Sequence, residues 1–206
     1  MKIERILPFA RTLLTNAVAE GDVAIDATAG NGHDTLFLAN LVGDTGHVYG
    51  FDIQPQAIQA TQRRLTEHHV EKRVTLIQES HSNISMLPTS INGRVTGAVF
   101  NLGYLPGGDK DIVTTSETTI SAIEQLLDLL APEGVIVLVI YHGHEQGKQE
   151  RDDLLTYVQN LDQKDVHVLQ YRFMNQQNNP PFIIAIEKDK PHMAYLFNIR
   201  YKRPLI

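Results

Sequence analysis

Short apolar runs alternate with segments of helical periodicity along most of the chain. Runs of strand length occur in VAID, GHVYGFDI, RVTLIQES, VTGAVFN and VIVLVIY. Between or after them, DTLFLANLV, residues 55–67, SETTISAIEQLLDLLAPEG and ERDDLLTYVQNL carry apolar residues three or four positions apart, which predicts helices. A serine is expected to cap the third of these helices, and Pro-Glu-Gly is expected to end it. Strands that alternate with helices favour a parallel sheet covered on both faces.

The two ends of the chain extend this pattern. Residues 1–21 place Ile6, Phe9, Leu13 and Leu14 at helical spacing before Gly21, which predicts a packing helix. Near the other end, the polar stretch NQQNNPP joins DVHVLQYRFMN to PPFIIAIEK, which predicts an antiparallel hairpin. We therefore expect an α/β, doubly wound, mostly parallel seven-stranded sheet with helices on both faces. It would form one domain over residues 1–190, followed by a tail, 191–206, of unknown role.

Composition narrows the classes of function. The chain has 206 residues, of which 42% are hydrophobic and 20% are charged, and no apolar run approaches the roughly 18 residues of a membrane span. The first residues contain a glutamate and a proline where a signal peptide would be apolar, so we expect a cytoplasmic protein. The absence of cysteine excludes disulfides, thiolate zinc sites and cysteine nucleophiles. The oligomeric state stays open, with a homodimer among the alternatives.

The stretch AIDATAGNGHDT follows the first predicted strand and has the composition of a ligand-binding turn. Gly30 and Gly32 allow the backbone to approach a ligand, at the place where doubly wound sheets bind them. Asp34 stands at the start of the following helix, and Thr35 replaces the third glycine of a dinucleotide fingerprint. A carboxylate at that position disfavours a pyrophosphate and suits a cationic group.

Acids at the ends of the next two strands extend the site. Asp52 lies about 20 residues after Gly32, where an acid commonly binds ribose hydroxyls, and Glu79 ends the third strand. Together with the turn, they describe a nucleoside that carries an aminoacyl-like group, S-adenosylmethionine, with S-adenosylhomocysteine as the product. The predicted cofactor-binding residues are Asp26, Thr28, Gly30, Asn31, Gly32, Asp34, Thr35, Asp52, Ile53, Glu79, Ser80, His81 and Asn101.

These residues resemble the class I S-adenosylmethionine-dependent methyltransferases over Asp22 to Lys188. Thr28 replaces the first glycine of the acid-x-Gly-x-Gly-x-Gly motif. DATAGNGHDT, NLGYLPGGDK, YHGHEQGKQE and NQQNNPPF together are similar to a small bacterial family once named putative rRNA methylases and associated with tRNA wobble-uridine modification. The resemblance implies an RNA N-methyltransferase that converts 5-aminomethyluridine to 5-methylaminomethyluridine in the tRNA anticodon.

An alkylamine must lose a proton before it attacks a methyl group, so the site needs polar acceptors. Asn101 and Tyr104 end the fourth strand and resemble the Asn-Pro-Pro-Tyr motif of amino methyltransferases, in which the amide accepts from the amine and the ring stacks on the base. The alternative is a turn cap and rim packing. His142 follows the fifth strand and is a predicted proton acceptor or base-orienting group, with an ordinary surface turn as the alternative.

Substrate contacts are expected from the loops at the same edge. Amides can read the base edges of unstacked RNA, although NQQNNPP could also be an ordinary hairpin loop. The predicted substrate-binding residues are Tyr104, Leu105, Pro106, Tyr141, His144, Asn175, Asn179, Pro180 and Pro181. With a net charge of −6, the chain must hold RNA by a local patch or a shaped pocket. The candidate phosphate ligands are Arg5, Arg11, Lys110, Lys148, Arg151 and Arg172.

Other functions remain open on the residues alone. The acidic charge also fits an rRNA or small-molecule methyltransferase. A nicotinamide oxidoreductase shares the fold class, but Asp34 and the missing third glycine argue against it. A nucleoside-binding regulatory protein without turnover is the remaining class. No metal is expected, because methyl transfer needs none and no H-E-x-x-H helix is present.

Overall fold

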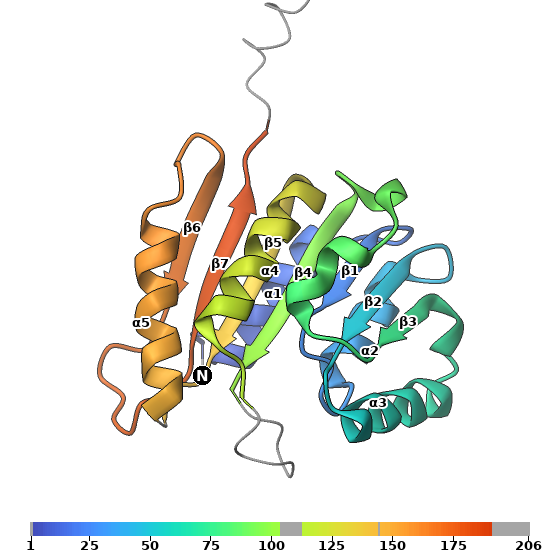
Figure 1. The fold of residues 1–206 in the computed structure, drawn as a ribbon, viewed down its shortest axis with the longest axis horizontal. Helices are drawn as coiled ribbons and strands as arrows, with labels where there is room; N and C mark the ends of the chain where they lie inside the picture. Colours follow the sequence, from blue (N-terminus) through green and yellow to red (C-terminus); the bar gives the residue numbers. More distant parts are fainter. Residues whose placement is uncertain (1, 104–112, 144, 191–206) are drawn as a thin grey trace, which may run out of the picture.

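A seven-stranded sheet forms the centre of the protein in the computed structural model, which describes residues 2–103, 113–143 and 145–190 (Figure 1). The strand order is β3-β2-β1-β4-β5-β7-β6. The strands are β1 (Val23–Asp26), β2 (His47–Phe51), β3 (Val74–Ile77), β4 (Val95–Leu102), β5 (Leu130–Ile140), β6 (Val166–Tyr171) and β7 (Phe182–Lys188). Strands β1 to β5 pair in parallel, and β7 pairs antiparallel with both β5 and β6. The predicted doubly wound sheet and its terminal hairpin are confirmed.

Helices cover both faces of this sheet. The helices are α1 (Ile6–Ala17), α2 (His33–Val42), α3 (Pro55–Glu67), α4 (Ser116–Leu129) and α5 (Glu145–Gln159), with short 3-10 turns η1 (Glu71–Arg73), η2 (His81–Met86) and η3 (Thr89–Ile91). One core lies between the sheet and α1, α2 and α3, and the other lies between the sheet and α4, α5 and η2. Ile25 faces the second core while its neighbour Ala24 faces the first, as the two-residue period of a strand requires.

The first helix packs as the sequence predicts. Ile6, Ala10 and Leu14 lie one or two turns apart on α1 and are buried against the core that includes β4, β5 and β7. Tyr171 of β6 stacks on Phe9, with ring centroids 4.0 Å apart, and its hydroxyl donates to the carbonyl oxygen of Glu4. The N-terminal helix is therefore tied to the C-terminal hairpin.

Two local details differ from the sequence predictions. Thr115, not a serine, caps α4, because its side chain accepts from the backbone N–H of Thr118. The Pro-Glu-Gly sequence after α4 lies inside β5, which begins at Leu130. The pairing of β4 with β5 shifts register between Val95 and Gly97, so the irregular residues are accommodated as a bulge at the start of the strand.

The carboxyl ends of β1, β2 and β4 meet where the strand order reverses, since β2 and β4 lie on opposite sides of β1. In doubly wound sheets this switch point is the usual ligand site. Among the described residues, no helix has the length and apolar character needed to cross a bilayer.

Candidate functional site

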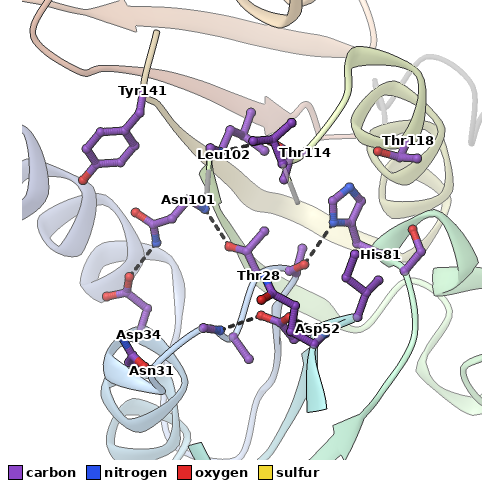
Figure 2. Close-up of a pocket in the computed structure, with 18 of the residues that line it drawn as sticks. Thr28, Asn31, Asp34, Asp52, His81, Asn101, Leu102, Thr114, Thr118 and Tyr141 are labelled. Atoms are coloured by element: carbon purple, nitrogen blue, oxygen red, sulfur yellow. Dashed lines mark hydrogen bonds between the residues drawn. The ribbon is translucent and has the colours of Figure 1, made fainter. Parts of the chain in front are cut away.

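A cavity of about 960 Å³ opens over the carboxyl ends of β1, β2 and β4 (Figure 2). Its walls come from α1, the turn after β1, the residues that follow β2 and β3, the end of β4, the start of α4, and Tyr141 after β5. The volume lies in the range of roughly 300–1,000 Å³ that is typical of small-ligand sites. Most predicted cofactor residues line it, namely Thr28, Gly30, Asn31, Asp34, Asp52, Ile53, Glu79, Ser80, His81 and Asn101.

The other predicted cofactor residues, Asp26 at the end of β1, Gly32 in the turn and Thr35 on α2, do not line the cavity. Asp26 is fully buried and accepts from the Thr35 hydroxyl at 2.6 Å and from the Thr28 N–H at 3.1 Å. The pKa of Asp26 is raised to about 7, by burial first and by the nearby Asp34 carboxylate second. This acid therefore shapes the turn and changes its charge near neutral pH.

Helix α3 holds the glycine turn from outside. Thr61 donates to the carbonyl oxygen of Gly30 at 3.0 Å, and Arg64 donates to that of Asn31 at 2.7 Å. Gly32 has a φ of 78°, and a Cβ there would lie 2.9 Å from the Cα of Thr61. Glycine is required at this position both by the backbone conformation and by the close packing of α3.

Asp52 connects the end of β2 to the turn. Its Oδ2 accepts from the Gly30 N–H and its Oδ1 from the Gln54 N–H, both at 2.9 Å. Burial raises the pKa of Asp52, while these two N–H groups oppose the rise. Each carboxylate oxygen keeps a lone pair for a further donor, so Asp52 can accept from ribose hydroxyls.

We expect Asp52→Ala to weaken S-adenosylmethionine binding by about 1–3 kcal/mol, because a charged acceptor for the ribose is lost. Isothermal titration calorimetry would measure the dissociation constant. Asp128→Ala, at an exposed position on α4, removes the same charge and should bind the cofactor like the wild type. An unchanged affinity for the Asp52 variant would remove Asp52 from the ribose site.

Asn101 joins the end of β4 to the other side of the turn. Its side-chain Nδ2 donates to Asp34 Oδ2 at 2.7 Å, and its backbone N–H donates to the hydroxyl of Thr28 at 2.7 Å (Figure 2). The other carboxylate oxygen of Asp34 accepts from Arg11 of α1 at 3.2 Å. The amide is thus oriented by its own donor, which leaves its carbonyl oxygen to accept from a ligand.

His81 forms part of the wall after β3. Its Nδ1 lies 3.1 Å from the carbonyl oxygen of Ala27, which can only accept, so Nδ1 carries the proton. Burial lowers the pKa of His81 to about 4. The ring is therefore neutral, and its buried Nε2 is an acceptor with no hydrogen-bond partner among the described residues.

Tyr141 closes the cavity on the β5 side, and its ring points toward Asn101 and Asp34 (Figure 2). Burial raises the pKa of Tyr141, and the Asp34 carboxylate adds to the rise, so the phenol stays protonated. It is 38% exposed, which leaves the ring accessible to a second ligand beside the cofactor.

Gly103, just after β4, and Thr114, just before α4, are joined to each other. Gly103 and Thr114 exchange hydrogen bonds, since the Gly103 N–H donates to the Thr114 hydroxyl and the Thr114 N–H donates to the Gly103 carbonyl oxygen. The Thr114 hydroxyl donates in turn to Glu150 at 2.7 Å. Glu150 of α5 is buried and also accepts from Thr119. This network positions Gly103 and Thr114 at the rim of the cavity.

The hydrogen-bond acceptors and the apolar surface of the cavity fit an adenosyl sulfonium. Asp52 offers acceptors for a ribose, and the adjoining Ile53 side chain, 52% exposed, offers an apolar surface for a base. Asp34 and the buried Asp26 place carboxylates near the turn, where they favour a cationic group. Among the described residues, no cluster of histidine and acidic side chains could hold a metal ion.

The predicted catalytic residue His142 and several predicted substrate residues lie elsewhere. His142, Asn179, Pro180 and Pro181 line a second cavity of about 460 Å³. Because His142 is separated from the first cavity, the geometry does not group it with Asn101. Asn175 is exposed and lines neither cavity. Tyr104, Leu105, Pro106 and His144, together with Lys110 and the tail 191–206, lie outside the described residues.

Sequence reasoning did not assign α1 or the start of α4 to this cavity, and it named Arg11 only as a candidate phosphate ligand. Leu7 and Arg11 line the first cavity, as do Thr114, Thr115 and Thr118 at the start of α4. Leu7 is 46% exposed although it lies on a packing helix. Leu7 is an apolar residue outside the buried stripe of α1, and this could have marked it as a residue with another role. The helical pattern alone does not show which cavity the residue borders.

The chain resembles a known protein family and a named relative. The sequence profile of the family described as Putative rRNA methylase matches residues 48–187. The tRNA (mnm(5)s(2)U34)-methyltransferase, chloroplastic, of Arabidopsis thaliana is 35% identical over 188 residues, which are 87% of this chain and 68% of that protein.

Solved structures give the same assignment. The crystal structure of a putative rRNA-methylase from Clostridium thermocellum is 43% identical, with a TM-score of 0.88 over 91% of this chain and 100% of that chain. A putative methyltransferase from Streptococcus mutans, solved in complex with S-adenosylhomocysteine, is 37% identical, with a TM-score of 0.82 over 90% of this chain and 99% of that chain. The chain therefore belongs to the putative rRNA methylase family and is an S-adenosylmethionine-dependent methyltransferase.

Proposed function

We propose that this methyltransferase acts on transfer RNA and converts 5-aminomethyluridine at the wobble position to 5-methylaminomethyluridine. The observation that carries the proposal is the Asn101 amide, which is held by Asp34 so that its carbonyl oxygen can accept from an amine in the cavity. The name of the Arabidopsis relative, a tRNA wobble-uridine methyltransferase, supports the RNA substrate.

The reaction requires a neutral amine whose lone pair is aligned with the methyl carbon. Bound S-adenosylmethionine supplies that methyl group on a sulfonium, and the electron pair of the broken C–S bond stays on sulfur. The carbonyl oxygen of Asn101 accepts an N–H of the amine and so fixes the direction of its lone pair. The carboxylate of Asp34, one hydrogen bond behind Asn101, stabilises the positive charge that develops on nitrogen until the methylated nitrogen releases a proton to solvent water.

Tyr141 is the proposed partner of the uridine ring. Its position beside Asn101 and its accessible ring suit stacking on an unstacked base, which is how proteins commonly hold single-stranded RNA. The protonated phenol can also donate to a base carbonyl. Tyr104, the residue predicted from the sequence to stack on the base, stays a prediction.

Nucleoside mass spectrometry tests the proposal. Transfer RNA that carries 5-aminomethyluridine is incubated with the enzyme and S-adenosylmethionine, digested and analysed. We expect one methyl group to be gained on that nucleoside. Omission of the cofactor is the control.

Ribosomal RNA is the second candidate substrate, because the description of the family names it. Deproteinised ribosomal RNA and small ribosomal subunits are therefore incubated in parallel. Methylation of either of these, with no methyl gain on transfer RNA, would replace the wobble proposal with the ribosomal one.

A further inference from the structure

The second cavity has the chemistry of an anion site. It lies between the end of β5, helix α5, the end of β6 and the β6–β7 loop. Arg151 and Arg172 both line it. Burial lowers the pKa of His142, and the positive charges of the two arginines lower it as well, so both guanidinium groups act on that ring. Guanidinium groups bind phosphate oxygens with paired donors, so this combination suits a phosphodiester.

The charges of these arginines are only partly neutralised. Arg151 donates through Nε to Asp152 at 2.7 Å, which uses one of the five N–H donors of a guanidinium. Arg172 is exposed and forms no salt bridge with any residue of the described ranges. Asp152 is the acid among the residues that line the cavity, so the cavity carries a net positive charge on a protein whose total charge is −6.

The remaining walls suit a nucleoside more than a bare ion. His142 is only 9% exposed, and its Nδ1 is buried without a hydrogen-bond partner among the described residues. Phe173 offers an aromatic face, and Gln176, Asn178 and Asn179 offer side-chain amides. Aromatic rings and amides are the groups that hold single-stranded RNA bases.

The position of this cavity relates it to the reaction. Tyr141 lines the first cavity and the next residue, His142, lines the second. Successive Cα atoms are about 3.8 Å apart, so the two cavities open on either side of one short backbone segment. A strand whose reacting base enters the first cavity can therefore place an adjoining nucleotide in the second.

We propose that the second cavity binds the phosphate and base of a nucleotide that adjoins the methylated one in the RNA. The proposal rests on the proposed function, because it takes RNA as the substrate. Arg151 and Arg172 bind the phosphate, and the loop amides with Phe173 contact the base. This nucleotide sets the position of the strand without touching the reacting atoms.

Binding of a fluorescent anticodon stem–loop RNA, measured by anisotropy at several salt concentrations, tests the site without turnover. We expect Arg172→Ala to weaken binding roughly tenfold, as for loss of a charged hydrogen bond. The slope of log K against log salt should become less steep by about 0.7, the value for one phosphate contact on a single strand. The affinity for S-adenosylmethionine should not change.

Two further variants distinguish RNA binding at the second cavity from a nonspecific attraction of RNA to positive charge. Arg94→Ala removes the same charge from an exposed position at the amino end of β4, whereas both cavities lie at the carboxyl ends of β4 and β5. This variant should bind RNA like the wild type. Asp152→Asn removes the carboxylate that competes for Arg151 and should tighten RNA binding severalfold. Equal effects of Arg172→Ala and Arg94→Ala, or weaker binding by Asp152→Asn, would overturn the proposal.

Competition distinguishes an RNA strand from a small anion. Inorganic phosphate and uridine monophosphate should displace the stem–loop only at concentrations far above its dissociation constant. Displacement by phosphate at comparable concentrations would show a free-anion site instead.

The outcomes for the two proposals can be told apart. If Arg172→Ala weakens RNA binding but transfer RNA gains no methyl group, the proposal for the second cavity holds and the wobble proposal fails. If transfer RNA is methylated, and Arg172→Ala changes neither the KM for transfer RNA nor the affinity for the stem–loop, only the proposal for the second cavity fails.

Discussion

Asn101→Ala should lower kcat on transfer RNA by about 100- to 1,000-fold while the dissociation constant of S-adenosylmethionine changes little. The expected loss is that of a positioned polar group that acts on the reacting atom. The backbone contact of Asn101 with Thr28 survives the change, and Asp34 keeps its ion pair with Arg11, so the turn should stay in place. Single-turnover assays with saturating cofactor, together with calorimetry, measure the two quantities.

Asn92→Ala provides the matched control, since Asn92 is exposed and lies before β4, away from the cavity. Its kcat should equal that of the wild type. If kcat of Asn101→Ala were also unchanged, the amide would not contact the amine. If kcat and cofactor affinity fell together, Asn101 would belong to the cofactor pocket instead.

We compare the free energy of unfolding of Asp26→Asn with that of the wild type at two pH values. The difference, variant minus wild type, should be more favourable to the variant at pH 8 than at pH 4.5 by on the order of 3 kcal/mol. The carboxyl group is fully buried, and its pKa is raised from 3.8 to about 7 by burial first and by Asp34 second. An asparagine keeps an acceptor for the Thr28 N–H and a partner for the Thr35 hydroxyl, but it carries no charge. Urea unfolding of the cofactor-free protein at several pH values measures the effect.

The direction follows from the protons bound by each state. Below about pH 4, both folded and unfolded chains hold the Asp26 proton. Between about pH 4 and 7, the folded protein keeps a proton that the unfolded chain has released, so the free energy of unfolding falls as the pH rises. Above about pH 7 the free energy of unfolding no longer falls on account of Asp26. The asparagine variant has no such fall, so its free energy of unfolding relative to the wild type increases between about pH 4 and 7 and is then constant.

Other acids with raised pKa values, such as Asp52 and Glu150, titrate in both proteins, so the difference between variant and wild type isolates Asp26. Asp128→Asn, exposed on α4, controls for the change in total charge and should give a pH profile parallel to the wild type. A parallel profile for Asp26→Asn would show that Asp26 does not carry the raised pKa.

The sequence alone was sufficient for the architecture and for grouping most of the polar residues that line the first cavity. Periodicity marks strands and helices because burial on one face or stripe is a local pattern. The acids and glycines of the site follow the strands directly, and parallel strands bring their carboxyl ends to one edge. Asp52, Asn101 and the turn from Thr28 to Asn31 could therefore be grouped before their contacts were known.

Only the tertiary structure decided how adjacent or distant residues divide between sites. Tyr141 and His142 are neighbours in the chain but line different cavities, because neighbouring side chains at a strand end point to opposite sides. Leu7 and Arg11 reach the first cavity because α1 packs on β4 and β5, far away in sequence. Asp26 became a buried acid rather than a cavity wall through the Thr28 and Thr35 contacts. Local pattern determines the elements, whereas side-chain surroundings depend on long-range packing.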